Sequence, residues 1–395
     1  MSNLGSGNYF MKSIQHIHLS YWRLIVPMGI TFAVVSQLYS TVCGLGLTFD
    51  SNMYLAGARY FQSSEWTWAF NHLTFQYKPP LYPLFLTVFT LDSMRVINTV
   101  LLSLSLFIIA FLFDALLKSK GFKMLGFLTV ASFTPLIMVH VYLWTEPLFL
   151  LILFGSILLY VKYNESKDLT ILIVLAVLSV FLSLIRHVGI FFILGYFLAI
   201  LLDNSNKKWK AFLYLIIASS GFIIWNLSIM FGGFYERILT FSAPIRSNSF
   251  VRLDNILLFL NGSSLWILPN NLPAWFRISV LIVLIILLAI GLFKVIKRSP
   301  QTILKGFVII IVTYYILMHL AFKLYISSEE RYLMPIFPLF ILVAFSTIEV
   351  LKEKIGVKFY IVKLIIFLWL FYPVVRTVKN AMFWHDKNCP VVVNK

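Results

Sequence analysis

Apolar stretches of roughly 17–25 residues, the length that a bilayer-spanning helix requires, recur along almost the whole chain and restrict its possible folds more than any other feature. The composition agrees, because 60% of the residues are hydrophobic and only 12% are charged. Soluble domains carry about 25% charged residues. The sequence therefore predicts an all-α polytopic membrane protein whose solvent is largely lipid.

We predict about eleven transmembrane helices, two or three of them short enough to be tilted or re-entrant. Their approximate ranges are 24–46, 93–117, 124–143, 147–161, 169–185, 188–202, 211–231, 276–293, 306–322, 332–350 and 359–375. The first range lacks a clear small-residue cleavage site, so we expect it to remain as a span. Residues 1–375 are expected to form a single membrane domain, followed by a short C-terminal tail, 376–395.

The connections between these spans fall into two groups. Short connections rich in lysine are LLKSKGFK, VKYNESKD, DNSNKKWK, KVIKRSPQTILK and LKEKIGVK. By the positive-inside rule, these connections and the N-terminus face the cytoplasm. The segments 47–92, 232–275 and 323–331 then face outward, as does the tail, and 47–92 is expected to carry interfacial helices. This orientation predicts a multi-pass protein of a plasma membrane, such as the bacterial inner membrane.

The formal charge of +17 raises the question of a nucleic-acid partner. Lysine-rich loops of membrane proteins reach such values by anchoring the spans, and no aromatic and basic nucleic-acid module stands out, so we predict membrane lipids and no nucleic acid. The two cysteines, Cys43 and Cys389, are too few for a disulfide framework and argue against a thiolate metal cluster.

Arginine dominates the basic residues of the predicted outer segments. Its planar fork suits phosphate and carboxylate groups, which hints at an anionic ligand there. Interfacial snorkelling or ion pairs that pack the loops explain the same pattern. These arginines are Arg59, Arg95, Arg186, Arg237, Arg246, Arg252, Arg277 and Arg331.

Two carboxylates lie at predicted outer ends of spans. Asp50 closes the first span in GLTFDSNMYLAGARY, either as a helix N-cap or as a catalytic acid or base. Glu146 stands in TEPLF, where an acid beside a proline in the first turn is also an ordinary helix opening. Because both acids are expected at the same depth, they could face one cleft.

The motif KPPLYP begins at Lys78 and contains three prolines that fix the direction of the chain. Pro79 pushes Lys78 out of helical geometry, which predicts a cation held at headgroup depth and suited to a lipid phosphate, or an anchor lysine beside a helix start. Arg331 begins the tenth predicted span next to Tyr332, where neighbouring glutamates could simply pair with it. Arg186 is a further outward cation.

These features together resemble the polyprenyl-phosphate-sugar-dependent glycosyltransferases of the GT-C fold, such as the protein O-mannosyltransferases, the lipid A aminoarabinose transferase and their bacterial relatives. The resemblance covers most of residues 20–350 and rests on the acid that ends the first span, an aromatic loop ending in KPPLYP, TEPLF, and ERYLMPIFPL. It implies transfer of a sugar from a polyprenyl-phosphate carrier to a lipid, glycan or protein acceptor on the outer face, with inversion.

The resemblance also implies roles for individual residues. Asp50 corresponds to the catalytic base or acceptor-binding acid, and Glu146 to a second acid. Lys78 corresponds to the lysine that contacts the carrier phosphate, with Arg331 and Tyr332 near it. FDS stands where many relatives have paired acids, which argues against a required divalent metal, and no other cofactor is predicted. Further candidates for the site are Arg186, Arg59 and Tyr82.

Two other classes of protein remain open. A transporter or flippase of an anionic lipid-linked substrate would use the same cations without chemistry, although charges or broken helices near mid-membrane would be more typical of it. An O-antigen polymerase or ligase would need its catalytic residues in 232–275. No zinc-protease, phosphate-loop or serine-elbow motif occurs. The polar candidates in that loop are Arg237, Arg246, Arg252, Glu236 and Asp254.

Overall fold

The computed structural model describes residues 21–63, 72–231, 253–298, 302–321, 329–355 and 358–389. Within these ranges the chain is α-helical, and its extended pairing is limited to one isolated bridge between Gly46 and Tyr142. The elements in chain order are η1 (Tyr21–Ile25), α2 (Val26–Ser40), α3 (Phe49–Gln62), α4 (Leu73–Tyr77), α5 (Leu81–Leu86), α6 (Leu91–Leu116), α7 (Lys120–Ala131), α8 (Thr134–Val141), α9 (Glu146–Ser166), α10 (Leu169–Ile185), α11 (Gly189–Leu201), α12 (Lys208–Phe231), α14 (Leu253–Ser264), α15 (Ala274–Arg298), α16 (Thr302–Ala321), α17 (Glu329–Leu333), η3 (Met334–Ile336), α18 (Phe337–Ile355), α19 (Lys358–Trp369) and α20 (Phe371–Asn388).

Nine helical segments of the described chain are long and apolar enough to cross a membrane, and each coincides with a span predicted from the sequence. They are Trp22–Ser40, Leu91–Leu116, Lys120–Val141, Glu146–Ser166, Lys208–Phe231, Ala274–Ile296, Ile303–Leu320, Glu330–Leu351 and Tyr360–Asn388. The other two predicted spans form the shorter apolar helices α10 and α11, of 17 and 13 residues. The prediction of a multi-span all-α protein is confirmed at this level.

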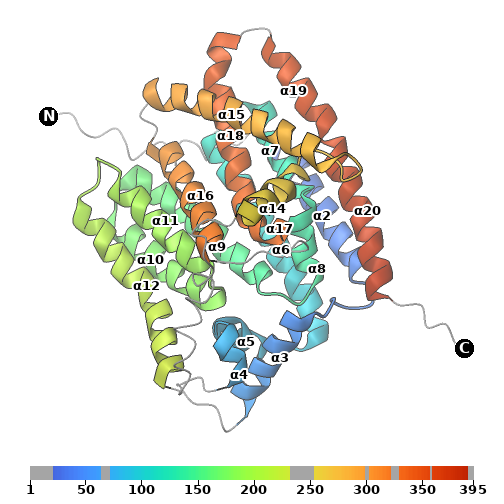
Figure 1. The fold of residues 1–395 in the computed structure, drawn as a ribbon, viewed down its shortest axis with the longest axis vertical. Helices are drawn as coiled ribbons and strands as arrows, with labels where there is room; N and C mark the ends of the chain where they lie inside the picture. Colours follow the sequence, from blue (N-terminus) through green and yellow to red (C-terminus); the bar gives the residue numbers. More distant parts are fainter. Residues whose placement is uncertain are drawn as a thin grey trace, which may run out of the picture.

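The described residues of the predicted segment 47–92 form α3, α4 and α5, which lie together at one end of the molecule, at the bottom of Figure 1. The helix α5 packs against both α3 and α10. Tyr82 of α5 is fully buried, and its ring meets that of Tyr54 edge-on, with 5.1 Å between centroids. The helix α5 therefore holds α3 against α10 rather than leaving it extended away from the apolar helices.

Close approach between the spans depends on small residues, as is usual where lipid supplies no hydrophobic drive for association. Gly221 of α12 faces α10, where an added Cβ would lie 2.5 Å from Val180. In α11, a Cβ on Gly195 would lie 3.1 Å from the Cα of Ile310 in α16. Both glycines allow helix backbones to pack more closely than larger side chains would.

The C-terminal region differs from the prediction. The last span was expected to end at 375, but α20 continues to Asn388, so most of the predicted tail is helical. Its buried residues, Pro373, Thr377, Ala381 and Trp384, recur at three- and four-residue spacing and form one face. The helix packs against α2 and α8, so this segment is held in the fold although several of its residues are charged.

Cys43 and Cys389 form a disulfide across a sequence separation of 346 residues, with their Cα atoms 5.4 Å apart. One bridge is not a disulfide framework, which the sequence argued against, but the pairing of the two cysteines was not predicted. The bond joins the connection after α2 to the end of α20. Asn388 supports the same junction by donating a hydrogen bond to the carbonyl of Ser40 at 3.1 Å.

Candidate functional site

Asp50 lies in the first turn of α3 and is not the N-cap that one reading of the sequence predicted. The N-cap is Thr48, whose hydroxyl accepts from the backbone of Ser51 at 3.4 Å, while the Ser51 hydroxyl accepts from the Thr48 backbone at 3.0 Å. Trp144 donates its indole N–H to the same Thr48 hydroxyl at 2.8 Å. Because Thr48 completes the capping box, the Asp50 carboxylate is available for tertiary contacts.

Lys78 follows α4 in extended geometry, at φ −132° and ψ 134°, as the proline after it predicts. Its ammonium group lies 2.6 Å from Oδ1 of Asp50 and 5.4 Å from the centre of the Tyr54 ring. Tyr54 comes one helical turn after Asp50, on the same side of α3. KPPLYP therefore directs its lysine at the carboxylate of the preceding helix.

Glu146 is the first residue of α9 and only 1% exposed. Two guanidinium groups contact its Oε1, the Nε of Arg331 and the Nη1 of Arg186, and Thr145 donates its hydroxyl to Oε2 at 3.3 Å. A buried carboxylate without cations would carry a desolvation penalty of several kcal/mol. Glu146 is therefore stable here because two arginines accompany it.

Arg331 connects the two acids. Its Nη1 lies 3.0 Å from Oδ2 of Asp50, while its Nε contacts Glu146. The guanidinium group also stacks over Trp144, 3.9 Å from the ring centre. One side chain of α17 thus joins α3 to α9, and the aromatic ring below it restricts its orientation.

The site carries three cations and two carboxylates, which leaves one formal positive charge. Burial by itself raises the pKa of the Asp50 carboxyl, but Lys78 and Arg331 outweigh burial and hold the pKa below its ordinary value of 3.8. Asp50 is therefore ionised at neutral pH. Burial also raises the pKa of Tyr54, and Glu146 and Asp50 raise it further, so its phenol stays neutral.

A polar pocket of about 160 Å³ opens among these groups. Since a water molecule takes up about 30 Å³ in the liquid, the pocket has room for several waters or a small anionic group. It is lined by Asp50, Tyr54, Tyr77, Lys78, Pro79, Thr145, Ile185, Arg186, His187, Val188, Arg331 and Tyr332.

Most of the candidates from the sequence converge here. Asp50, Lys78, Arg186, Arg331 and Tyr332 line the pocket, and Glu146 lies behind the arginines. Two candidates do not reach it. Arg59 is an exposed residue in the last turn of α3, and Tyr82 is buried behind Tyr54.

Sequence reasoning missed two contributors. Tyr54 could have been found from its position four residues after Asp50, because such residues share a helix face. Trp144, beneath the Arg331 guanidinium, stands two residues before Glu146, yet nothing local distinguishes it from an interfacial tryptophan. The loop candidates Arg237, Arg246, Arg252 and Glu236 lie outside the described residues, as does the side chain of Asp254.

An apolar groove of about 440 Å³ adjoins the polar pocket between α5, α10 and α12. Pro80 and Leu81 of its lining directly follow Lys78 and Pro79 of the pocket. Across the groove, the Trp225 ring lies 4.8 Å from the ring of His187 in the pocket. The lining residues are Phe61, Pro80, Leu81, Leu84, Thr87, Val180, Leu184, Ser220, Gly221, Ile224 and Trp225.

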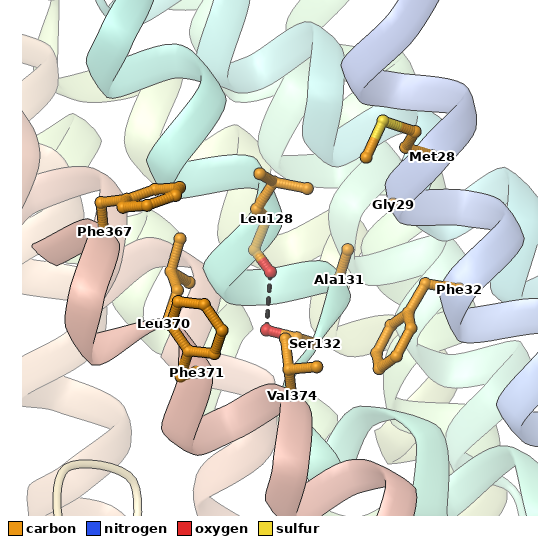
Figure 2. A pocket seen from close by; sticks show the side chains of 10 residues that line it. All are labelled: Met28, Gly29, Phe32, Leu128, Ala131, Ser132, Phe367, Leu370, Phe371 and Val374. Atoms are coloured by element: carbon orange, nitrogen blue, oxygen red, sulfur yellow. Dashed lines mark hydrogen bonds between the residues drawn. The ribbon is translucent and has the colours of Figure 1, made fainter.

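A second apolar pocket, of about 280 Å³, lies between α2, α7 and the junction of α19 with α20 (Figure 2). None of the described side chains that line it is charged. Its one side-chain hydroxyl, on Ser132, donates to the carbonyl of Leu128 at 2.7 Å (Figure 2). With that hydroxyl already bonded to the preceding turn, the pocket offers shape and apolar surface but no reactive group.

Among the described residues, no three His, Cys, Asp or Glu side chains gather closely enough to hold a metal ion. Comparison with models of known protein families gives no match, and neither does comparison with curated protein sequences. The described chain defines a multi-helix all-α protein with nine candidate membrane spans. Its most elaborate polar feature is the pocket that Arg331 organises.

Proposed function

We propose that this protein is an integral membrane glycosyltransferase that moves a sugar from a polyprenyl-phosphate carrier to a lipid, glycan or protein acceptor. One observation carries the proposal: three cations and two carboxylates meet in a pocket that adjoins an apolar groove. A lipid-linked sugar phosphate matches this arrangement, because its apolar chain suits the groove while its phosphate and sugar suit the polar pocket.

The cations suit the phosphate of such a donor. Lys78 and Arg331 both line the pocket, and Arg186 contributes a third positive charge beside them. Guanidinium and ammonium groups in a site with little water stabilise the charge that grows on a departing phosphate. The formal excess of positive charge favours a bound anion.

The apolar groove suits the carrier chain. It begins at Pro80 and Leu81, which follow Lys78 and Pro79 of the pocket, and continues between α10 and α12. A prenyl chain in this groove would bring its phosphate to the pocket. Gly221 lines the groove where α12 approaches α10, and an added Cβ there would lie 2.5 Å from Val180.

The transfer itself needs a base and a leaving group. The acceptor hydroxyl gives its proton to the Asp50 carboxylate while its oxygen forms a bond to C1 of the sugar. The bond between C1 and the phosphate oxygen breaks, and its electron pair leaves with the phosphate, so a single displacement inverts the anomeric centre. General-base assistance of this kind is typically worth about 100- to 10,000-fold.

Glu146 fits a different role from the one expected. Being 1% exposed and paired to two arginines, it does not reach an acceptor. It acts as a positioning residue, because it fixes Arg186 and Arg331 where they face the phosphate. Asp50 is then the single carboxylate of the proposed site that is open to the acceptor.

The same proposal assigns the site to the outer face of a plasma membrane. Disulfides persist in oxidising compartments, outside the cytoplasm. Cys43 lies seven positions before Asp50 in the sequence, so the disulfide supports an outward orientation for this end of the molecule. The lysine-rich connections then face the cytoplasm.

The test uses purified protein incubated with lipid and envelope extract from its source cell, followed by mass spectrometry. We expect one polyprenyl-phosphate sugar to be consumed and a matching sugar adduct to appear, with heated protein as the blank. Binding of such a lipid without any consumption would contradict the proposed enzymatic activity and favour a transporter of the same substrate.

A further inference from the structure

Both oxygens of the Asp50 carboxylate are occupied by cations. Oδ1 lies 2.6 Å from the Lys78 ammonium group, and Oδ2 lies 3.0 Å from Nη1 of Arg331. A carboxylate held in this way is a poor base, because transfer of a proton to it would break two ion pairs. The residue best placed to activate an acceptor is therefore unready in this state.

The two acids of the site differ in how easily they can release their partners. Glu146 is 1% exposed, whereas Asp50 is 26% exposed and its partner Lys78 is 21% exposed. Solvent and ligand can reach the Asp50 carboxylate and Lys78 but not the Glu146 carboxylate. Arg331 contacts both acids, so it can give up Asp50 and still be neutralised by Glu146.

We propose that Asp50 is an internal substitute for the phosphate of the lipid donor, bound to Lys78 and Arg331 until that phosphate displaces it. The inference rests on the proposed function and adds an order of events to it. The donor binds first, and its phosphate takes the place of the Asp50 carboxylate at Lys78 and Arg331. Only then is Asp50 available to the acceptor.

The exchange also changes the chemistry of Asp50. In the state described, Lys78 and Arg331 keep the pKa of Asp50 low. The other ionisable groups that line the pocket are Tyr54, Tyr77, Arg186, His187 and Tyr332, and Glu146 lies behind the arginines. After the exchange, the carboxylate has lost two cations and gained a negative neighbour. Both changes favour the protonated form, so the carboxylate becomes a stronger base when the donor is present.

This exchange makes activation of the acceptor depend on the presence of the donor. Without the donor, both oxygens of the Asp50 carboxylate are paired with cations, so Asp50 is not free to act as a base. With the donor bound, the base appears next to the C1 atom at which it is needed. The cations never lack a partner, so the exchange avoids the large penalty for an unpaired buried charge.

The decisive measurement is binding of farnesyl phosphate, a short polyprenyl phosphate, to the purified full chain in detergent, followed by native mass spectrometry. Asp50→Asn removes the internal competitor, so we expect it to bind the probe about tenfold more tightly than wild type. Lys78→Ala should bind more weakly. When Asp50→Asn is combined with Lys78→Ala, the gain in affinity for farnesyl phosphate should be smaller. Lys78, which binds either the Asp50 carboxylate or the phosphate, is then absent.

Two controls separate the exchange from general effects. Asp92→Asn removes an exposed acid from the first turn of α6 and should leave binding unchanged. Inorganic phosphate should bind far more weakly than farnesyl phosphate, and equal binding would overturn the assignment to a lipid headgroup. Unfolding temperatures measured on the same samples identify any variant that is misfolded, and Asp50→Ala then repeats the test.

The result does not depend on turnover. If Asp50→Asn binds the probe no more tightly than wild type, the internal-substitute proposal is wrong, even if the wild-type protein transfers sugar. If Asp50→Asn binds more tightly and the wild-type protein transfers nothing, the exchange stands and the enzymatic proposal fails.

Discussion

Arg331 and Glu146 lie 185 positions apart in the sequence, and their side chains form an ion pair at the start of α9. Arg186 contacts the same carboxylate oxygen from the connection between α10 and α11. The site is therefore assembled by tertiary contacts between five separate stretches of the chain, around α3, the α4–α5 connection with Lys78, α9, α10 and α17. Its integrity depends on those stretches staying together.

Glu146→Gln should destabilise the fold strongly, because it leaves two buried guanidinium groups without their shared counter-ion. Breaking a buried pair in this way typically costs about 3–5 kcal/mol. Thermal unfolding in detergent measures the effect. Glu165→Gln, at an exposed position on α9, is the matched control and should change the unfolding temperature little. Equal behaviour of the two variants would contradict the structural role of Glu146.

Arg376→Ala should weaken binding of farnesyl phosphate although Arg376 does not line the pocket. Its Nη2 lies 2.8 and 2.6 Å from the two carboxylate oxygens of Glu330, the residue before Arg331, and its Nη1 donates to the Leu265 carbonyl at 2.9 Å. Arg376 thus positions Arg331 from the C-terminal helix.

The test of this positioning role is rescue by charge. Arg376→Lys keeps the charge but loses the paired geometry. We expect it to restore part of the affinity for farnesyl phosphate that Arg376→Ala loses. Unchanged binding in Arg376→Ala would mean that α17 is held without the C-terminal helix.

Loss of the disulfide should lower stability. Removal of a native disulfide typically costs about 2–5 kcal/mol, and this one ties the end of α20 to the connection that leads to Asp50. We expect Cys43→Ser to unfold at lower temperature than wild type. A reductant should lower the unfolding temperature of the wild-type protein and leave that of Cys43→Ser unchanged. A reductant effect of equal size on both proteins would show that the bond is not the cause.

The pH dependence of stability follows from the lowered pKa of Asp50. A carboxyl group whose pKa is lower in the folded protein contributes stability above its ordinary pKa, 3.8, and loses it as the pH falls through the folded pKa. Wild type should therefore unfold at a higher temperature than Asp50→Asn at neutral pH. The difference should shrink as the pH falls below about 4, toward the folded pKa. A difference that grew on acidification would contradict the ion pairs of Asp50.

The sequence was sufficient for features that depend on local rules. Hydropathy located the spans, because lipid demands a continuous apolar run wherever a helix crosses. Pro147 marked the start of α9, and Pro79 marked the extended geometry at Lys78. In each case, the residue that carries the signal lies next to the feature that it determines.

Tertiary pairing was beyond such reasoning. The contact of Asp50 with Lys78 spans 28 positions, and its contact with Arg331 spans 281. Neither contact could be predicted from one sequence, and the same holds for the disulfide between Cys43 and Cys389. The sequence left open whether Asp50 is the N-cap of α3, because Thr48 and Asp50 are both good capping residues, and only the backbone shows which one is used.

The central claim is that the pocket of Asp50, Lys78 and Arg331 transfers a sugar from a lipid-linked phosphate. The most direct measurement compares wild type with Asp50→Asn in the envelope-extract assay, with bound lipid and sugar adduct quantified in the same samples. The account predicts that Asp50→Asn retains the donor lipid and loses adduct formation by about 100-fold or more. Full adduct formation by Asp50→Asn would contradict it.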